Sequence, residues 1–365
     1  MNAPLRIGLI GCGKIADGHA EVLAYLDGAQ LVAVCDREPV LAEQLAMRFN
    51  VPAWYGDVQQ MLERERLDVV HITTPPGAHL PLTEQCVAAG AHVYLEKPLA
   101  LDAATAGRLI DAVEAAGRKM CINYWPNFDP SAMQLKKMLA QGAIGDPVHI
   151  ESSIGYDLSG AYGQALMSDE RHWVHSLPGK LFQNVLDHIC NRMTPFFPSG
   201  TEPEVHAFAY KRREQVRGDS TDKLLDELRV YVKAGNVSAY GTLSSHTRPV
   251  PNALKIYGTK GTVEIDFNNR TVVQPATQRY PSALGRLFPA FQMAARYFAQ
   301  GRQNVQLFRR HEFQFFAGMT ELLTQFYDAI RNDGPVPIRY SEILQVAEIM
   351  DSVHRQVYPA AEVSR

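Results

Sequence analysis

The chain has 365 residues, of which 46% are hydrophobic and 21% are charged, and its formal net charge is −3 at pH 7. This length exceeds one typical domain and can bury a large core, which favours two domains and excludes long disordered regions. The near-balanced charge leaves no broad basic face, so nucleic acid and membranes are not expected as partners, whereas a small molecule is.

The first residues, Met1 to Pro4, lead directly into an apolar pattern without the regions of a secretory leader. No uncharged apolar run approaches the roughly 18 residues of a membrane-spanning helix. The five cysteines are scattered through apolar segments, in a spacing typical of neither a disulfide framework nor a zinc site. We therefore expect a cytoplasmic protein with reduced, buried thiols.

The first third of the chain alternates apolar runs with helical patterns. Strands are predicted over residues 5–10, 30–35, 69–73, 92–95 and 119–123, and helices over residues 20–26, 39–49, 81–89 and 103–116. Such alternation indicates crossover connections, and near-continuous apolar strands are typical of a parallel sheet covered on both faces. The sequence therefore predicts a doubly wound α/β domain over residues 1–125.

The pattern changes after Pro130. A helix is predicted over residues 131–140, and strands over residues 147–153, 205–212, 224–234, 237–245, 253–257 and 262–267. Residues 282–302 form the pattern of an amphipathic surface helix, and residues 310–332 and 341–358 that of a final helical pair. Residues 126–365 are therefore predicted to form an α+β domain with an open, mainly antiparallel sheet.

A glycine motif connects the first predicted strand to a helix. Gly11 permits a tight turn, Gly13 lets the backbone approach a pyrophosphate, and Ala16 allows close packing of helix on strand. Asp36 ends the second strand about 20 residues further on, where a carboxylate binds ribose hydroxyls. These features predict a Rossmann domain that binds NAD, because a carboxylate repels a 2′-phosphate. Arg37 can pair with such a phosphate, so NADP stays open.

Further motifs carry a family resemblance. They are Thr73 to His79, Glu96-Lys97-Pro98, Phe128-Asp129-Pro130, Ile144 to Val148, Gly258 to Thr262 and Pro337. Together with the glycine motif, they make essentially the whole chain resemble the Gfo/Idh/MocA oxidoreductases, the glucose–fructose oxidoreductase and inositol dehydrogenase group. The resemblance implies homodimers or homotetramers formed through the C-terminal sheet. It also implies a sugar, cyclitol, sugar-nucleotide or similar polyol substrate.

The resemblance places the cofactor contacts in the glycine motif and directly after the strands predicted over residues 30–35, 69–73 and 92–95. The residues are Gly11, Gly13, Lys14, Ile15, Asp36, Arg37, Thr74, Pro75, His79, Glu96 and Lys97. Lys97 follows a strand and precedes a proline, so its side chain is expected at the carboxyl edge of the sheet, where ligands bind. An ammonium there can donate to a substrate oxygen during hydride transfer. The alternative is a surface lysine paired with Glu96.

A second catalytic element is expected on a helix within residues 179–188. His188 matches the family pattern, whereas Asn184 stands where an aspartate is usual and Lys180 replaces a glycine. A spacing of four residues puts Asn184 and His188 on one helix face. Asparagine orients a hydroxyl but cannot take its proton, so His188 is predicted as the proton carrier and Lys97 as the orienting donor. The alternative for His188 is a core histidine.

Other candidates carry less chemistry. Asp187 lies about 100° around the helix from His188 and is expected to be structural or to face a partner. Residues 171–175 are expected either to contact substrate or to form a packed loop. No metal site is predicted, because no carboxylate or cysteine completes a ligand spacing with His172, His175 and His188. Asn127 replaces an arginine that is frequent in relatives.

The predicted activity is reversible hydride transfer between NAD(H) and a secondary alcohol or ketone of a sugar-like substrate. One alternative keeps the NAD bound and yields net elimination or hydrolysis after transient oxidation. A second alternative is a non-enzymatic ligand sensor on the same fold. The presence of Lys97 and His188 argues against the sensor.

Overall fold

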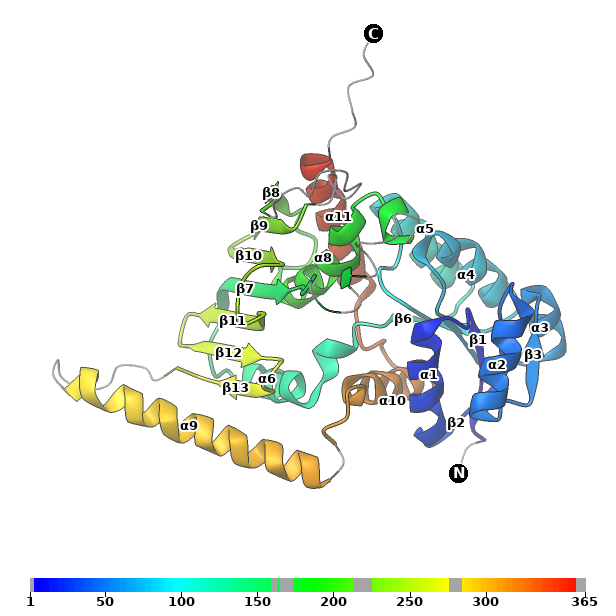
Figure 1. Cartoon of the computed structure of the whole chain (residues 1–365), viewed down its shortest axis with the longest axis horizontal. Helices are drawn as coiled ribbons and strands as arrows, with labels where there is room; N and C mark the ends of the chain where they lie inside the picture. Colours follow the sequence, from blue (N-terminus) through cyan, green and yellow to red (C-terminus); the bar gives the residue numbers. More distant parts are fainter. Residues whose placement is uncertain are drawn as a thin grey trace, which may run out of the picture. The chain divides into compact units, whose positions relative to one another are not determined.

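A computed structural model describes residues 3–158, 160, 163–164, 173–212, 225–275, 284–310 and 312–358. The chain divides into two compact units. One comprises Met1–Trp125 and Gly318–Ala347, and the other comprises Pro126–Ala317 and Glu348–Arg365. Each unit is built around its own sheet (Figure 1).

The first unit contains a six-stranded parallel sheet in the order β3-β2-β1-β4-β5-β6. The strands are β1 (Leu5–Ile10), β2 (Ala29–Cys35), β3 (Ala53–Tyr55), β4 (Val69–Ile72), β5 (His92–Leu95) and β6 (Met120–Ile122). The helices are α1 (Lys14–Tyr25), α2 (Pro39–Phe49), α3 (Val58–Arg64), α4 (His79–Ala88), α5 (Ala103–Ala115) and α10 (Ala317–Arg331). This arrangement confirms the predicted doubly wound Rossmann sheet.

Local sequence signals explain where these helices begin. The carboxylate of Asp57 accepts a hydrogen bond from the backbone N–H of Gln60 at 2.9 Å, and that of Asp102 accepts one from Thr105 at 2.7 Å. Both aspartates thereby satisfy amide groups that have no partner within the helix. Pro39 begins α2, where its missing N–H costs nothing. The strand β3 and the helix α3 were not predicted, since segments of three and seven residues are too short to show a clear period.

The C-terminal helices change the predicted division of the chain. Residues 318–347 pack with the first unit, although the sequence suggested one contiguous C-terminal domain over residues 126–365. Phe326 and Tyr327 of α10 are fully buried, and the Tyr327 hydroxyl lies 2.7 Å from Nε2 of His71 on β4. Helix α11 (Tyr340–Val357) begins in this unit, where the Tyr340 hydroxyl accepts a hydrogen bond from the backbone of Met120.

The second unit contains a seven-stranded sheet in the order β13-β12-β11-β7-β10-β9-β8. The strands are β7 (Pro147–Gly155), β8 (Glu204–Tyr210), β9 (Glu227–Ala234), β10 (Val237–Ser244), β11 (Asn252–Gly258), β12 (Thr262–Asp266) and β13 (Thr271–Val273). Among the described strands of this second sheet, only β7 and β10 pair in parallel, so the predicted mainly antiparallel sheet is confirmed. The helices are α6 (Pro130–Ala140), α8 (Lys180–Met193), α9 (Leu284–Arg309) and the end of α11.

Helix α8 covers one face of this sheet. A Cβ atom at Gly241 on β10 would lie 2.8 Å from Cγ2 of Ile189, so the glycine allows helix and strand to approach closely. The neighbouring residue, Tyr240, points to the opposite face because side chains alternate along a strand. Phe208, Tyr231 and Tyr240 remain at least 39% exposed on that open face.

No helix within the described ranges combines the length and the apolar character that crossing a membrane requires.

Candidate cofactor and active site

The glycine loop after β1 has a backbone that only glycine adopts readily at its first position. Gly11 has a φ of +95°, and a Cβ atom there would lie 2.8 Å from Cγ2 of Thr74. Its N–H donates to the carbonyl oxygen of Cys35, which ties the loop to the end of β2. The glycine is therefore required by the fold itself.

Gly13, unlike Gly11, has an ordinary backbone conformation and space around its Cβ position. Its φ of −76° is open to any residue, and a Cβ atom there would meet no described protein atom within 4 Å. It caps the start of α1, and the exposed Lys14 and half-buried Ile15 follow it. The helix amides therefore face open space at the place where a pyrophosphate would lie.

Asp36 connects the end of β2 to the same loop. Its Oδ2 accepts a hydrogen bond from the backbone N–H of Cys12 at 2.7 Å, and its Oδ1 accepts one from Glu38 at 2.9 Å. The carboxylate is thus held beside the glycine loop and is half-buried, whereas Arg37 is exposed. Each oxygen keeps a further lone pair that can accept from a ribose hydroxyl.

The loop after β4 supplies a polar atom that the protein leaves unused. The Oγ1 of Thr74 is buried and has no hydrogen-bond partner among the described residues. Thr73 instead donates to the carbonyl oxygens of Ile10 and Gly11, which joins this loop to the glycine loop. A buried hydroxyl without a partner costs stability, so Thr74 fits a bound ligand such as the dinucleotide.

His79 is fully buried between two loops. Its Nδ1 lies 2.8 Å from the carbonyl oxygen of Leu99 and its Nε2 lies 2.9 Å from that of Thr74. Desolvation by burial lowers the pKa of His79. Its ring thus braces the loop that carries Thr74 and the exposed Pro75 against the loop after β5.

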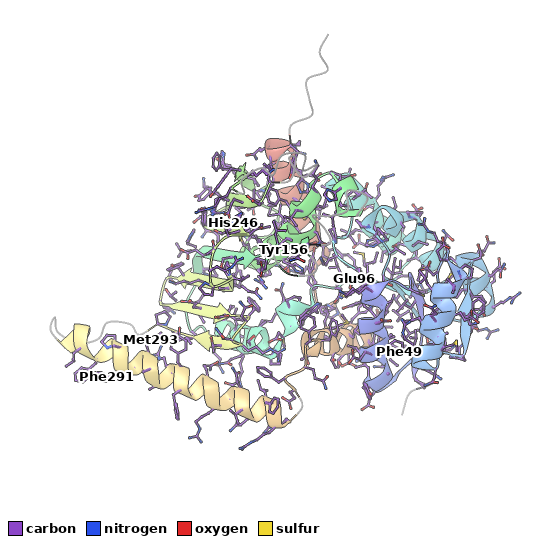
Figure 2. The ribbon with its side chains drawn as sticks, viewed as in Figure 1. Phe49, Glu96, Tyr156, His246, Phe291 and Met293 are labelled. Carbon is purple, nitrogen blue, oxygen red and sulfur yellow. The ribbon has the colours of Figure 1, made fainter. Side chains whose placement is uncertain are left out.

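Glu96, labelled in Figure 2, lies directly after β5 and belongs to a buried hydrogen-bond network. Its carboxylate accepts from Asn123 at 2.5 Å and lies 2.9 Å from Nε2 of His19. Burial by itself raises the pKa of Glu96, but the hydrogen bonds and charge of His19, with Asn123 and Lys97, lower it overall. The network continues through His71 to Tyr327.

The sequence pattern did not predict His19, His71 and Tyr327 as members of this network. His71 interrupts an apolar strand and His19 lies on the buried side of α1, so each is a polar residue within an apolar pattern. Buried polar groups need partners, and that requirement was the available signal. Their partners come from segments far apart in the sequence, which a single-sequence pattern does not pair.

Lys97 follows Glu96 at the carboxyl end of β5 and is half-buried. Its backbone N–H donates to Oε2 of Glu96 at 3.1 Å, and its peptide bond to Pro98 is cis. The carboxyl ends of β1, β2, β4 and β5 lie along one edge because the sheet is parallel. The glycine loop, Asp36, Thr74 and Lys97 are therefore brought to the same edge of the first unit.

Helix α8 of the second unit carries Asn184 and His188. Every residue from Leu181 to Met193 is buried except these two, which are half-buried. Their spacing of four places them on one side of the helix, as predicted. Asp187 is buried and accepts a hydrogen bond from Asn191, which fits the structural role considered for it.

Lys180 and Asn127, two of the residues that depart from the family pattern, lie at the start of α8 and beside its end. Lys180 begins α8 with a φ of +47°, a conformation that glycine would adopt at lower cost. The Asn127 side chain donates to the backbone and side-chain oxygens of Asn191 near the end of α8. Arg171 and His172 lie outside the described residues, so the prediction for that loop stays open. Among the described residues, no cluster of metal-binding side chains occurs.

Comparison with known proteins identifies relatives of the first unit. A family model described as "Oxidoreductase family, NAD-binding Rossmann fold" matches residues 5–124. Mouse trans-1,2-dihydrobenzene-1,2-diol dehydrogenase is 33% identical over 157 residues, which cover 42% of this chain and 47% of that enzyme. Inositol 2-dehydrogenase 4 of Saccharopolyspora erythraea is 34% identical over 149 residues, which cover 40% and 44%. The chain thus matches about half the length of these two relatives.

A solved structure resembles the chain over nearly its whole length. It is an oxidoreductase from Agrobacterium radiobacter in complex with NAD+, L-tartaric acid and magnesium, with a TM-score of 0.75, 16% identity and coverage of 98% of this chain and 97% of the other. That likeness shows that both units share the fold. The match of residues 5–124, together with the glycine loop, identifies the first unit as an NAD-binding Rossmann domain of the oxidoreductase family that the model describes.

Proposed function

We propose that this protein is an NAD-dependent dehydrogenase or reductase that acts on a secondary alcohol or ketone of a sugar, cyclitol or sugar-nucleotide-like substrate. The convergence of the glycine loop, Asp36, Thr74 and Lys97 at one edge of a parallel sheet carries this proposal. Ligands of open α/β sheets bind at that edge. Relatives named as diol and inositol dehydrogenases support hydroxyl-bearing ring compounds as the substrate class.

The residues that fit NAD are those of the first unit. Gly11, Gly13, Lys14 and Ile15 would hold the pyrophosphate, and Asp36 would accept from the ribose hydroxyls. Bound NAD supplies an acceptor for the hydride that leaves the substrate carbon. Asp36 is hydrogen-bonded to the glycine loop, whereas Arg37 is exposed. We therefore expect the Asp36 carboxylate to decide the cofactor preference, and it favours NAD over NADP because it repels a 2′-phosphate.

The substrate oxygen needs a donor and a proton acceptor. We assign the donor role to Lys97, whose ammonium stabilises negative charge that develops on that oxygen. His188 takes the hydroxyl proton when the alcohol is oxidised and returns it when the ketone is reduced. Asn184 orients the hydroxyl through its amide, because it cannot itself accept the proton as a base.

Assembly and location are part of the proposal. The open face of the second sheet carries Phe208, Tyr231 and Tyr240, an aromatic surface of the kind that stable interfaces bury. We assign this face to a homodimer or homotetramer.

A cytoplasmic location is supported by all five cysteines being buried free thiols, which suit a reducing compartment.

The activity is tested by incubating the purified chain with NAD or NADP and a panel of inositols, aldoses, glycosides and nucleotide sugars. Growth of the 340 nm absorbance with NAD and at least one panel member is the expected result. A thermal-shift series at matched concentrations checks the cofactor, and a larger shift with NADPH than with NADH would reverse the assignment. Product formation without net NADH would indicate transient oxidation with elimination or hydrolysis.

A further inference from the structure

Helix α9 exposes large apolar side chains on the side that faces away from the rest of the second unit. Its inward side includes the half-buried Met293 and Leu307 and two polar contacts with the rest of the second unit, in which Gln300 accepts from the backbone of Val272 and Asn304 donates to the carbonyl oxygen of Asn269. Its outward side is apolar, with Leu287, Phe291, Phe298, Val305 and Phe308 between 50% and 71% exposed. Figure 2 shows Phe291 on the side of α9 away from β13.

The outward residues have the spacing of a helix–helix seam. Steps of four and three residues alternate from Leu287 to Phe308, through Phe291, Ala294, Phe298, Gly301 and Val305. This repeat of 3.5 residues keeps a narrow apolar line on one side of a helix and is typical of a helix that pairs with another helix. The seam extends along α9, whose 26 residues measure about 39 Å.

We propose that α9 pairs antiparallel with α9 of a second copy of this chain. In the register that overlaps the whole helix, Leu287 meets Val305 of the other copy, Phe291 meets Gly301, and Ala294 meets Phe298. Phe291 and Phe298 then each face a small residue, which allows the two helices to interdigitate. A parallel pair would place Phe298 against Phe298 and Gly301 against Gly301, with crowding in one layer and a gap in the next.

Charge is consistent with the antiparallel register. Residues 284–310 contain five arginines and neither aspartate nor glutamate. In this register, Arg302 flanks Phe288 or Ala295 of the second copy, and Arg309 flanks Phe288, so arginines do not meet across the seam. Phe288 and Tyr297 flank the seam and are 39% and 49% exposed. The regular steps of four and three residues favour a second helix over a lipid surface as the occupant of this face.

Cross-linking of the full chain tests the register. A mixture of Leu287→Cys and Val305→Cys proteins is expected to yield a cross-linked dimer with a short bis-maleimide, whereas each variant alone is not. The native cysteines give little background because they are buried, and burial raises the pKa of Cys12, Cys35 and Cys86 to about 12. Cross-linking of each single variant with itself would overturn the antiparallel arrangement, and absence of the mixed product would overturn the pairing.

A charge at the centre of the seam gives an independent test. Phe298→Glu should weaken self-association by about 100-fold in sedimentation equilibrium, because pairing would bury the carboxylate. The matched control is Gln303→Glu, which adds the same charge at an exposed position off the seam and should keep the wild-type mass. Equal masses for both variants and wild type would refute the proposal. Binding of wild type, but not Phe298→Glu, to phosphatidylglycerol vesicles without any mixed cross-link would assign the face to lipid instead.

Discussion

Lys97 follows a parallel strand and is adjacent to a buried carboxylate that hydrogen bonds hold in place. We expect Lys97→Ala to lower turnover by about 10²–10³-fold, since one charge-stabilising donor is lost. NAD affinity should change little because the pyrophosphate is bound by the glycine loop. Steady-state kinetics and a fluorescence titration with NADH check both parts, and wild-type turnover would show that Lys97 has no catalytic role.

His188 is one of two half-buried residues between Leu181 and Met193. If it carries the proton, His188→Asn should reduce turnover by about 10²–10⁴-fold. Asn184→Asp is the informative partner variant, because a carboxylate one turn away stabilises the imidazolium and should move the pH–rate profile to higher pH. Normal turnover of His188→Asn with an unchanged pH profile would place the proton route elsewhere.

His354 on α11 offers a prediction about acid stability. Desolvation by burial lowers the pKa of His354 from 6.5 to about 4. The unfolded chain therefore binds this proton more readily, so the contribution of His354 to stability is complete above pH 6.5 and is lost as the pH falls to 4. His354→Phe keeps a ring but removes the titration. Its melting temperature should fall less than that of wild type between pH 6.5 and pH 4, a difference worth up to about 3 kcal/mol. Parallel curves for the two proteins would contradict this.

At the scale of the element, the two glycines of the glycine loop have different roles: Gly13 leaves room for the ligand, whereas Gly11 is required by the fold. A Cβ atom at Gly13 meets no described protein atom, so Gly13→Ala should leave the melting temperature without ligand nearly unchanged. The methyl group would occupy the space meant for the pyrophosphate. The stabilisation by NAD, about 2.7 kcal/mol at 100 times the Kd, should therefore be reduced or lost in a thermal-shift series. An NAD shift equal to that of wild type would count against the assigned cofactor position.

Gly11→Ala serves as the contrasting variant in the same loop. With a φ of +95° and Thr74 at 2.8 Å from the added Cβ atom, this substitution strains the protein without any ligand. Its melting temperature should fall before NAD is added, which Gly13→Ala should not show. The two variants together distinguish a fold requirement from a ligand requirement.

At the scale of the whole molecule, the open sheet face predicts assembly. Tyr231 and Tyr240 are paired across β9 and β10 and remain 42% and 39% exposed in one copy. Tyr240→Glu should reduce the mass measured by light scattering after gel filtration, because a charge would enter the apolar interface. Lys137→Glu on the exposed side of α6 is the control and should keep the wild-type mass. Unchanged mass for Tyr240→Glu would remove the sheet from the assembly.

Sequence patterns by themselves determined the doubly wound sheet, the second mixed sheet and the positions of the glycine loop, Asp36 and Lys97. These features depend on local periods and on residues close to strand ends, so they are readable without long-range contacts. The elements β3 and α3 were not predicted because their segments are short. The proposed roles of Asn184 and His188 came from the family resemblance, because hydrophobic periodicity does not indicate a catalytic role.

Only the tertiary structure decided which distant residues meet. The network from Glu96 through His19 and His71 to Tyr327 joins segments up to 256 residues apart. Tyr327 belongs to residues 318–347, which pack with the first unit. It also decided that large apolar side chains of α9 face outward, which the predicted amphipathic pattern of residues 282–302 did not specify. An amphipathic period shows that a helix has two sides, but the direction in which each side points depends on the neighbours that the fold provides.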